Sequence, residues 1–148
     1  MPAQATALSP QTLIDAAKAP FQAYNEKNWD KVRSSLTPDF VYDEVSTGRK
    51  AKGPDATIQL WQGWAQTFPD SKARFDNVLV SGNSVVLEVT WTGTHKGQLQ
   101  TPNGAIEATG KSIDIRACAV VELAGEKAKL QRHYFDMATM LSQLGIMG

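Results

Sequence analysis

The chain contains 148 residues, of which 42% are hydrophobic and 20% are charged, and its 15 basic residues balance its 15 acidic residues. This composition indicates a single globular domain over residues 1–148, long enough to bury a core without disulfides or a structural metal. The zero net charge excludes binding to nucleic acid or to an anionic membrane that depends mainly on a basic surface.

Cysteine usage and the N-terminus indicate where such a chain works. Cys118 is the only cysteine, so no intramolecular disulfide can form and a thiolate zinc site lacks ligands. The first residues lack the basic leader and the apolar run of a secretory signal, and no later stretch is long enough to span a bilayer. We therefore expect a soluble cytoplasmic protein whose Ala-rich residues 1–8 form a loose end.

The first half of the chain predicts three helices and one strand. Ser9 followed by proline predicts the start of a helix that runs to about Lys27. Asn28 caps a second, short helix, which pairs with the first as a hairpin. Aromatic and β-branched residues over 40–45 predict a strand, and an apolar stripe over 53–69 predicts an amphipathic third helix.

The second half predicts mainly strands joined by short turns. The expected strands cover residues 74–80, 85–95, 109–123 and 128–135, and a closing helix covers 136–144. Successive hairpins predict a curved antiparallel sheet with the helices on one face. The expected fold is an α+β cone in which three helices from the N-terminal half enclose a pocket for a hydrophobic small molecule.

Asp136 and His95 are the first candidates for chemistry. Asp136 follows the last strand, where apolar walls would raise its pKa and make it a general base, or where it would simply cap the closing helix. His95 shares the face of Leu87, Val89 and Trp91 if the strand stays regular. It would donate a hydrogen bond to a ligand carbonyl, or serve as an ordinary hydrogen-bonded histidine at a strand end.

Other polar candidates follow from strand alternation. Glu44 shares one side of its strand with Tyr42, which makes it a second possible base or an exposed strand end. Asp114 and Arg116 share a face, on which they would orient a water in the pocket or decorate a solvated face. His133 lies between Arg132 and Tyr134 on its strand and faces the side opposite to them. We include His133 among the candidate pocket residues, and we expect at most one histidine to face the pocket.

Aromatic residues complete the list of expected pocket residues. Trp61, Trp64 and Trp91 would form a flat aromatic wall or part of the core. The sequence contains no phosphate loop, dinucleotide fingerprint, nucleophile elbow or convincing cluster of metal ligands. We therefore expect neither a cofactor nor a metal.

Several segments, in this order, resemble the SnoaL-like polyketide cyclases of the nuclear transport factor 2-like superfamily. They are residues 38–44 (PDFVYDE), 53–55 (GPD), 68–70 (FPD), 92–97 (TGTHKG) and 133–136 (HYFD), and the resemblance covers about residues 10–147. The closing segment from Tyr134 to Gly145 is its most family-specific part.

The resemblance implies a cone that assembles as a homodimer or homotetramer through the outer face of the sheet. In the characterised cyclases an aspartate near the end of the last strand abstracts a proton from a polyketide ester, and an intramolecular aldol reaction closes a ring. Asp136 is similar in position to that aspartate, and His95 resembles a pocket histidine. The implied function is therefore a cofactor-independent cyclase or isomerase.

Three alternatives stay open at the level of sequence, because one fold hosts many functions. The first is a module of the same fold that binds a ligand or a partner without catalysis. The second is a ketosteroid-isomerase-like enzyme with Glu44 as proton shuttle. The third is an epoxide-hydrolase-like enzyme that uses Asp114, Arg116 and Asp136, although their order and spacing differ from the pattern of that family.

Overall fold

A computed structural model describes residues 8–101 and 103–146 and contains four helices in that part of the chain. They are α1 (Pro10–Asn25), α2 (Trp29–Ser34), α3 (Pro54–Thr67) and α4 (Met137–Gln143). The expected caps are present: the side chain of Ser9 accepts a hydrogen bond from the backbone N–H of Thr12, and that of Asn28 accepts one from Lys31. All but the first residue of the expected loose end at 1–8 lies outside the described residues.

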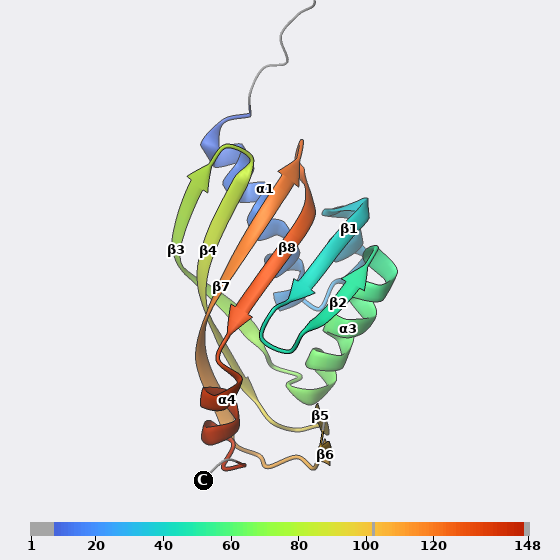
Figure 1. The fold of residues 1–148 in the computed structure, drawn as a ribbon, viewed down its shortest axis with the longest axis vertical. Coiled ribbons are helices and arrows are strands. Elements are labelled where there is room, and N and C mark those ends of the chain that lie inside the picture. The colour runs from blue at the N-terminus through green and yellow to red at the C-terminus, as the bar shows by residue number, and fades with distance from the viewer. Residues whose placement is uncertain (1–7, 102, 147–148) are drawn as a thin grey trace, which may run out of the picture.

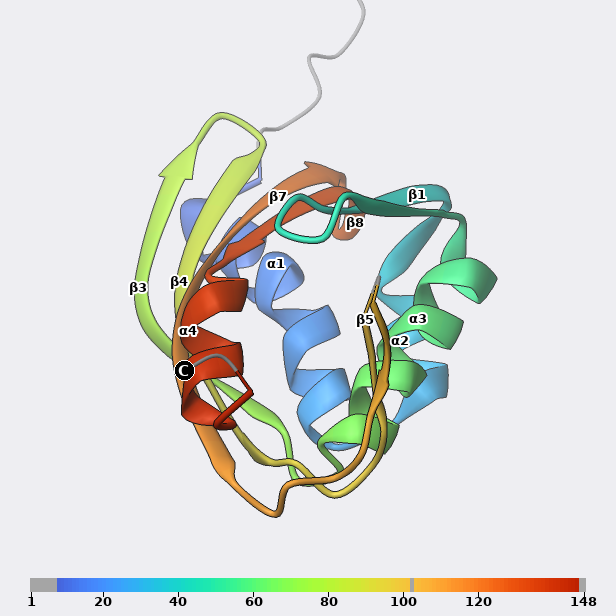
Figure 2. The same ribbon diagram turned by 60° about the horizontal axis from the view of Figure 1, so that its bottom comes forward.

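A six-stranded sheet curves around α1 in the order β2-β1-β8-β7-β4-β3 (Figures 1 and 2). Its strands are β1 (Leu36–Glu44), β2 (Arg49–Lys52), β3 (Lys72–Ser81), β4 (Ser84–Thr94), β7 (Ser112–Ala124) and β8 (Lys127–Phe135). Helices α1 and α3 pack against its inner side, and α4 lies beside β7 at one end. The expected α+β architecture with a curved sheet is confirmed.

Three details of the expected sheet need correction. Strand β1 pairs in parallel with β8, so the sheet is mixed, because the chain reaches β1 from α2 and not from a neighbouring hairpin strand. The region expected as a loop between β4 and β7 contains a small separate hairpin of β5 (Leu99–Thr101) and β6 (Gly104–Ile106). Strand β2 was also not expected, because four residues carry too little alternation to signal a strand.

A bulge in β8 decides which of its side chains face inward. Opposite β7, Leu123 pairs with Ala128 and Glu122 pairs with Leu130, so Lys129 is the extra residue. Ala128 is buried before the bulge, and after it the buried positions change parity to Gln131 and His133. The bulge therefore turns two polar side chains toward the core.

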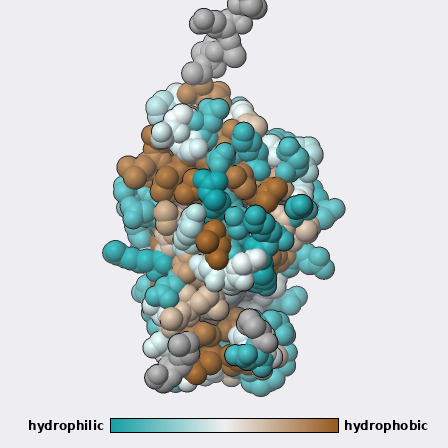
Figure 3. Space-filling model, in the orientation of Figure 1, coloured by the Kyte–Doolittle hydropathy of each residue, from teal (hydrophilic) through white to brown (hydrophobic). Residues whose placement is uncertain are grey.

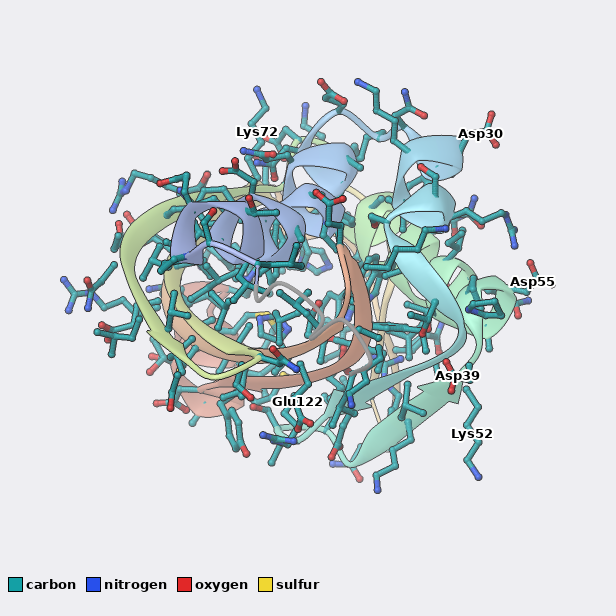
Figure 4. The ribbon with its side chains drawn as sticks, turned by 90° about the horizontal axis from the view of Figure 1, so that it is seen from above. Asp30, Asp39, Lys52, Asp55, Lys72 and Glu122 are labelled. Carbon is teal, nitrogen blue, oxygen red and sulfur yellow. The ribbon has the colours of Figure 1, made fainter. Side chains whose placement is uncertain are left out.

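The core fills the space between the sheet and the helices with aromatic and aliphatic side chains. Its fully buried members include Phe40, Leu87, Val85 and Val89. The charged side chains labelled in Figure 4 project away from this interior. No helix of the described ranges is long and apolar enough to cross a membrane.

Candidate functional site

A cavity of about 80 Å³ lies between α1, α3 and the inner face of the sheet. Its wall is mainly aromatic and aliphatic, with a few polar groups: Pro20, Phe21, Tyr24, Tyr42, Trp61, Trp64, Phe68, Ser71, Trp91, Ile113, Ile115, Gln131, His133, Phe135 and Met140. One water needs roughly 10–15 Å³ of such space, and sites for drug-sized ligands occupy about 300–1,000 Å³. The cavity therefore has room for several waters but is smaller than typical sites for drug-sized ligands.

His133 is a titratable residue in this wall, and each of its two ring nitrogens has a hydrogen-bond partner. Its Nε2 accepts a hydrogen bond of 3.2 Å from the indole N–H of Trp91, and its Nδ1 lies 3.0 Å from the hydroxyl of Tyr42. Because Nε2 is the acceptor, the neutral ring carries its proton on Nδ1 and donates it to Tyr42. Burial lowers the pKa of His133 to about 4, and the negative charge of Glu44 opposes this effect.

Behind His133 and Tyr42 lies a buried carboxylate. Glu44 is 0% exposed, and its Oε2 accepts hydrogen bonds from the Tyr42 hydroxyl at 2.8 Å and from the Trp64 indole N–H at 2.9 Å. Its Oε1 accepts from Thr47 at 2.6 Å and from two nitrogens of Arg49 at 2.9 and 2.7 Å. Burial raises the pKa of Glu44, but these donors outweigh burial and hold its pKa below the ordinary value.

This environment makes Glu44 a fixed negative charge one layer behind the cavity wall. The sequence suggested that Glu44 is either a base in the pocket or an exposed strand end. Neither suggestion fits, because Glu44 is buried and is not among the described residues that line the cavity. A carboxylate with a lowered pKa and five hydrogen bonds is a weak proton acceptor. Through Tyr42 it instead orients His133 and favours positive charge on that ring.

A pair of hydroxyl groups forms a second polar point in the wall. The hydroxyl of Tyr24 lies 2.7 Å from that of Ser71, and burial raises the pKa of Tyr24 to about 12. Both groups therefore stay protonated at neutral pH. One hydroxyl hydrogen is used within the pair, which leaves the other for a ligand oxygen.

Asp136 lies outside the cavity, at the start of α4. Its side chain accepts hydrogen bonds from the backbone N–H groups of Ala138 and Thr139 at 2.9 and 3.2 Å and from the Thr139 hydroxyl at 2.7 Å. The Thr139 hydroxyl is the main cause that lowers the pKa of Asp136, and the side chain is exposed. The structure therefore shows the capping alternative, with no apolar wall around the carboxylate.

His95 is completely buried but also lies outside the lining, just beyond the end of β4. Its Nδ1 accepts a hydrogen bond from the backbone N–H of Thr109 at 3.1 Å, and its ring packs on Phe68 with centroids 5.5 Å apart. The chain leaves β4 before His95, so strand alternation does not carry this side chain to the cavity. His95 instead joins the two ends of the segment that contains β5 and β6.

The expected pocket position of Arg116 needs a correction. Arg116 and Asp114 are exposed on the outer face of β7, while Ile113, Ile115 and Ala117 are buried on the inner face. The alternation predicted which residues share a face, and the apolar set faces the core. Arg116 and Asp114 therefore lie on a solvated face, which is the second of the two expectations for this pair. The three residues of the epoxide-hydrolase-like alternative, which include Asp136, do not meet in the cavity.

The structure thus brings Tyr42, Trp61, Trp64, Trp91 and His133 of the expected residues together. It adds Tyr24, Ser71 and Gln131, which the sequence did not single out. Tyr24 is one of the buried residues of α1. Within residues 8–101 and 103–146, no three His, Cys, Asp or Glu side chains are grouped to hold a metal.

A model of the SnoaL-like polyketide cyclase family matches residues 14–144, almost the whole chain. The chain belongs to this family. The cone, its internal cavity and the closing segment after β8 are in keeping with the match and with a nuclear transport factor 2-like fold. No curated protein matches the chain.

Solved structures show the same fold at low sequence identity. A candidate SnoaL-like polyketide cyclase from Jannaschia sp. CCS1 has a TM-score of 0.81 and 18% identity, covering 97% of this chain and 100% of that one. AclR, a candidate hydroxylase from Streptomyces galilaeus, has a TM-score of 0.80 and 18% identity, covering 95% and 100%. IdmH, a candidate polyketide cyclase from Streptomyces antibioticus, has a TM-score of 0.77 and 20% identity, covering 90% and 98%.

Proposed function

We propose that the chain is a proton-transfer enzyme acting on a compact, largely apolar carbonyl compound, with His133 as the group that takes up and returns the proton. The observation that carries the proposal is the chain of hydrogen bonds from Trp91 through His133 and Tyr42 to Glu44 at the cavity wall. An imidazole held at Nδ1 by such a chain presents Nε2 as its basic atom.

The reaction begins when the substrate displaces the indole N–H of Trp91 from Nε2, where the existing bond is long at 3.2 Å. A C–H bond next to the carbonyl breaks, its proton moves to Nε2, and its electron pair passes to the carbonyl oxygen as an enolate. The free hydrogen of the Tyr24–Ser71 pair donates to that oxygen. The imidazolium then returns the proton to a carbon of the enolate. In a cyclase-type reaction, the enolate carbon instead attacks a second carbonyl of the same molecule, and the imidazolium gives its proton to the alkoxide that forms.

The low pKa of His133 is compatible with this role. Burial penalises an imidazolium in this apolar wall, so His133 is neutral at pH 7 but is a weak base until negative charge develops beside the ring. An enolate formed beside the ring supplies the opposite charge and offsets the cost of burying the imidazolium. Glu44 adds a negative charge on the far side of Tyr42.

This assignment gives Asp136 and Glu44 other tasks. Asp136 stabilises α4, and its position at the exposed N-cap supports no contact with a molecule in the cavity. Glu44 is a positioning residue that acts through Tyr42. The role of base that the family resemblance implied for Asp136 therefore passes to His133 in our proposal.

A binding module without catalysis is the second candidate. Its support is that Trp91 already occupies Nε2 of His133, so each nitrogen of this imidazole has a protein partner. If the bound molecule leaves that contact intact, the cavity holds it by apolar contact alone. The two candidates then differ in proton exchange and not in binding.

Exchange of α-hydrogens for deuterium separates these candidates. Cyclohexanone and acetophenone, incubated with the protein in D₂O near pH 7 and followed by proton NMR, should lose their α-hydrogen signals faster than in buffer. His133→Gln should reduce the catalysed rate by about 10²–10⁴-fold, the usual contribution of general acid–base catalysis. Asp136→Asn is the matched control and should keep the wild-type rate.

Ligand affinity, measured on the same samples by the fluorescence of the cavity tryptophans, shows whether the compounds bind. Binding without exchange would favour the second candidate. Full exchange in His133→Gln would rule out His133 as the base.

We also propose, from the family resemblance, that the chain works in the cytoplasm as a homodimer formed through the outer face of the sheet. Leu79 on β3 is 57% exposed and Tyr134 on β8 is 42% exposed, and Figure 3 shows hydrophobic side chains gathered over the upper part of this face. Analytical ultracentrifugation should give twice the mass of one chain. Leu79→Lys should shift the protein toward the monomer.

A further inference from the structure

Lys27, just beyond the end of α1, has a backbone conformation that lysine rarely adopts. Its φ of 54° is the one positive φ of a non-glycine residue in the described ranges. The backbone N–H groups of Lys27 and Asn28 donate to the oxygens of Tyr24 and Ala23, which closes the end of the helix. Glycine is the usual residue in this position, because a Cβ makes the left-handed conformation costly. The contacts of the Lys27 side chain show what lysine adds here.

The Lys27 side chain contacts both residues of the hydroxyl pair in the cavity wall. Its Nζ lies 4.3 Å from the centroid of the Tyr24 ring and donates a hydrogen bond of 2.5 Å to the backbone oxygen of Ser71. Tyr24 and Ser71 line the cavity, and their hydroxyls lie 2.7 Å apart. Lys27 is not among the described lining residues. Its ammonium group therefore lies behind the polar point that these two hydroxyls form.

The surroundings of Lys27 leave its positive charge without an ion-pair partner among the described residues. Burial is the main cause that lowers the pKa of Lys27, and the positive charge of Lys72 lowers it further. The negative charge of Asp70 opposes both effects, but its carboxylate accepts hydrogen bonds from the backbone N–H and the hydroxyl of Thr94. A partly buried ammonium without an ion-pair partner is stabilised by an anion that binds nearby.

The charges behind the cavity wall give the cavity a direction. The ring of Trp91 packs on that of Tyr24, with centroids 5.4 Å apart, and on that of His133, with centroids 6.0 Å apart. Trp91 thus joins the two polar points of the wall. A positive charge, that of Lys27, lies behind Tyr24, whereas the negative charge of Glu44 lies behind His133. An anionic atom of a ligand therefore favours the Tyr24 side.

We propose that Lys27 is a positioning residue that makes the Tyr24–Ser71 side of the cavity prefer an anionic oxygen, that of an enolate or a phenolate, to the neutral oxygen of a ketone or a phenol. The ammonium group attracts the anion through space and polarises the ring of Tyr24, which strengthens its hydroxyl as a donor. Tighter binding of the enolate than of the ketone accelerates proton transfer. The statement about the enolate rests on the proposed function, whereas the preference for a phenolate does not.

The ionisation of bound p-nitrophenol tests this preference directly. Its anion is coloured and the neutral form is not, so absorbance during a pH titration gives the pKa of the probe when saturated with protein. In Lys27→Met, which keeps an unbranched side chain but removes the charge, this pKa should rise by about one unit, a tenfold loss of acidity. Nitrobenzene carries no ionisable group and should bind the wild type and the variant alike.

Three further variants separate the charge of Lys27 from its structural role. Lys18→Met removes another lysine of α1, which lies 4.9 Å from the centroid of Phe75, a ring outside the described lining, and it should leave the pKa of the bound probe unchanged. Lys27→Arg keeps the charge and should stay close to the wild type. Lys27→Gly also removes the backbone strain, so it tests the charge even if Lys27→Met fails to fold. It should show the same rise of about one unit.

Three results would overturn the inference. They are an unchanged probe pKa in Lys27→Met and Lys27→Gly, an equal rise in Lys18→Met, or no binding of p-nitrophenolate to the wild type. The test does not depend on catalysis. If the probe pKa depends on Lys27 but ketones exchange no deuterium, the proposed function fails and the preference for an anionic oxygen stands. If exchange occurs and the probe pKa is the same without Lys27, the proposed function stands and this inference fails.

Discussion

Acid should destabilise the protein in a pH window set by His133. In the folded chain burial lowers the pKa of this residue to about 4, from an ordinary value of 6.5 in the unfolded chain. Between these values the unfolded state binds about one more proton than the folded state, so the free energy of unfolding falls as the pH falls. The contribution is fully present above pH 6.5 and is lost by about pH 4.

The difference between 6.5 and about 4 corresponds to about 3 kcal/mol, since each pKa unit is equivalent to about 1.4 kcal/mol. His133 is only 7% exposed, so solvent screening removes little of this effect. For a domain of this size, a loss of about 3 kcal/mol is a large part of the whole stability. Glu44 does not confuse the measurement, because its pKa is lowered and its own contribution is lost only at more acidic pH.

Urea denaturation at several pH values between 7 and 4 would measure this contribution. His133→Gln removes the titrating group but keeps a hydrogen-bonding side chain, so its free energy of unfolding should vary about 3 kcal/mol less over this range than that of the wild type. Equal pH dependence in both proteins would refute the assignment of a neutral, buried His133.

Three further substitutions test the structure around the cavity. Glu44→Gln should lower the free energy of unfolding by about 2–3 kcal/mol, measured by thermal or urea unfolding. This loss is below the usual value of about 3–5 kcal/mol for breaking a buried ion pair, because the side chain of Arg49 is 48% exposed and regains water. An unchanged stability would contradict the hydrogen-bond network around Glu44. Asp136→Ala should lower the melting temperature by removing the cap of α4 but leave ligand affinity unchanged, and a change in affinity would return Asp136 to the site. Gly97→Ala should reduce the melting temperature more strongly, because an added Cβ would overlap the backbone oxygen of Gln66. An unchanged melting temperature would mean that this loop readily moves.

The fold was predictable because local signals agreed with one another. The caps at Ser9 and Asn28, the apolar stripe of α3 and the strand alternation of β7 each predicted an element that the structure contains. The parallel contact between β1 and β8 was not predictable in this way. It joins residues about 90 positions apart, and no turn between them determines their register.

The candidate site was predictable only in its apolar part. Trp61, Trp64 and Trp91 line the cavity as their periodicity suggested, because apolar side chains follow the buried face of each element. Glu44 shows the limit of this logic: parity correctly placed it on the side of Tyr42, but parity does not show that Arg49 returns across the β1–β2 turn to pair with it. Such a partner makes complete burial of a carboxylate tolerable.

The bulge at Lys129 determines which polar side chains of β8 face inward. Regular alternation from the buried Ala128 would turn Leu130 and Arg132 inward and Gln131 and His133 outward. One extra residue reverses this pattern, because a shift of one position moves every later side chain to the opposite face. Gln131 and His133 both line the cavity. Deletion of Lys129 would join Ala128 directly to Leu130, so regular alternation would then keep Gln131 and His133 on the inner face without a bulge.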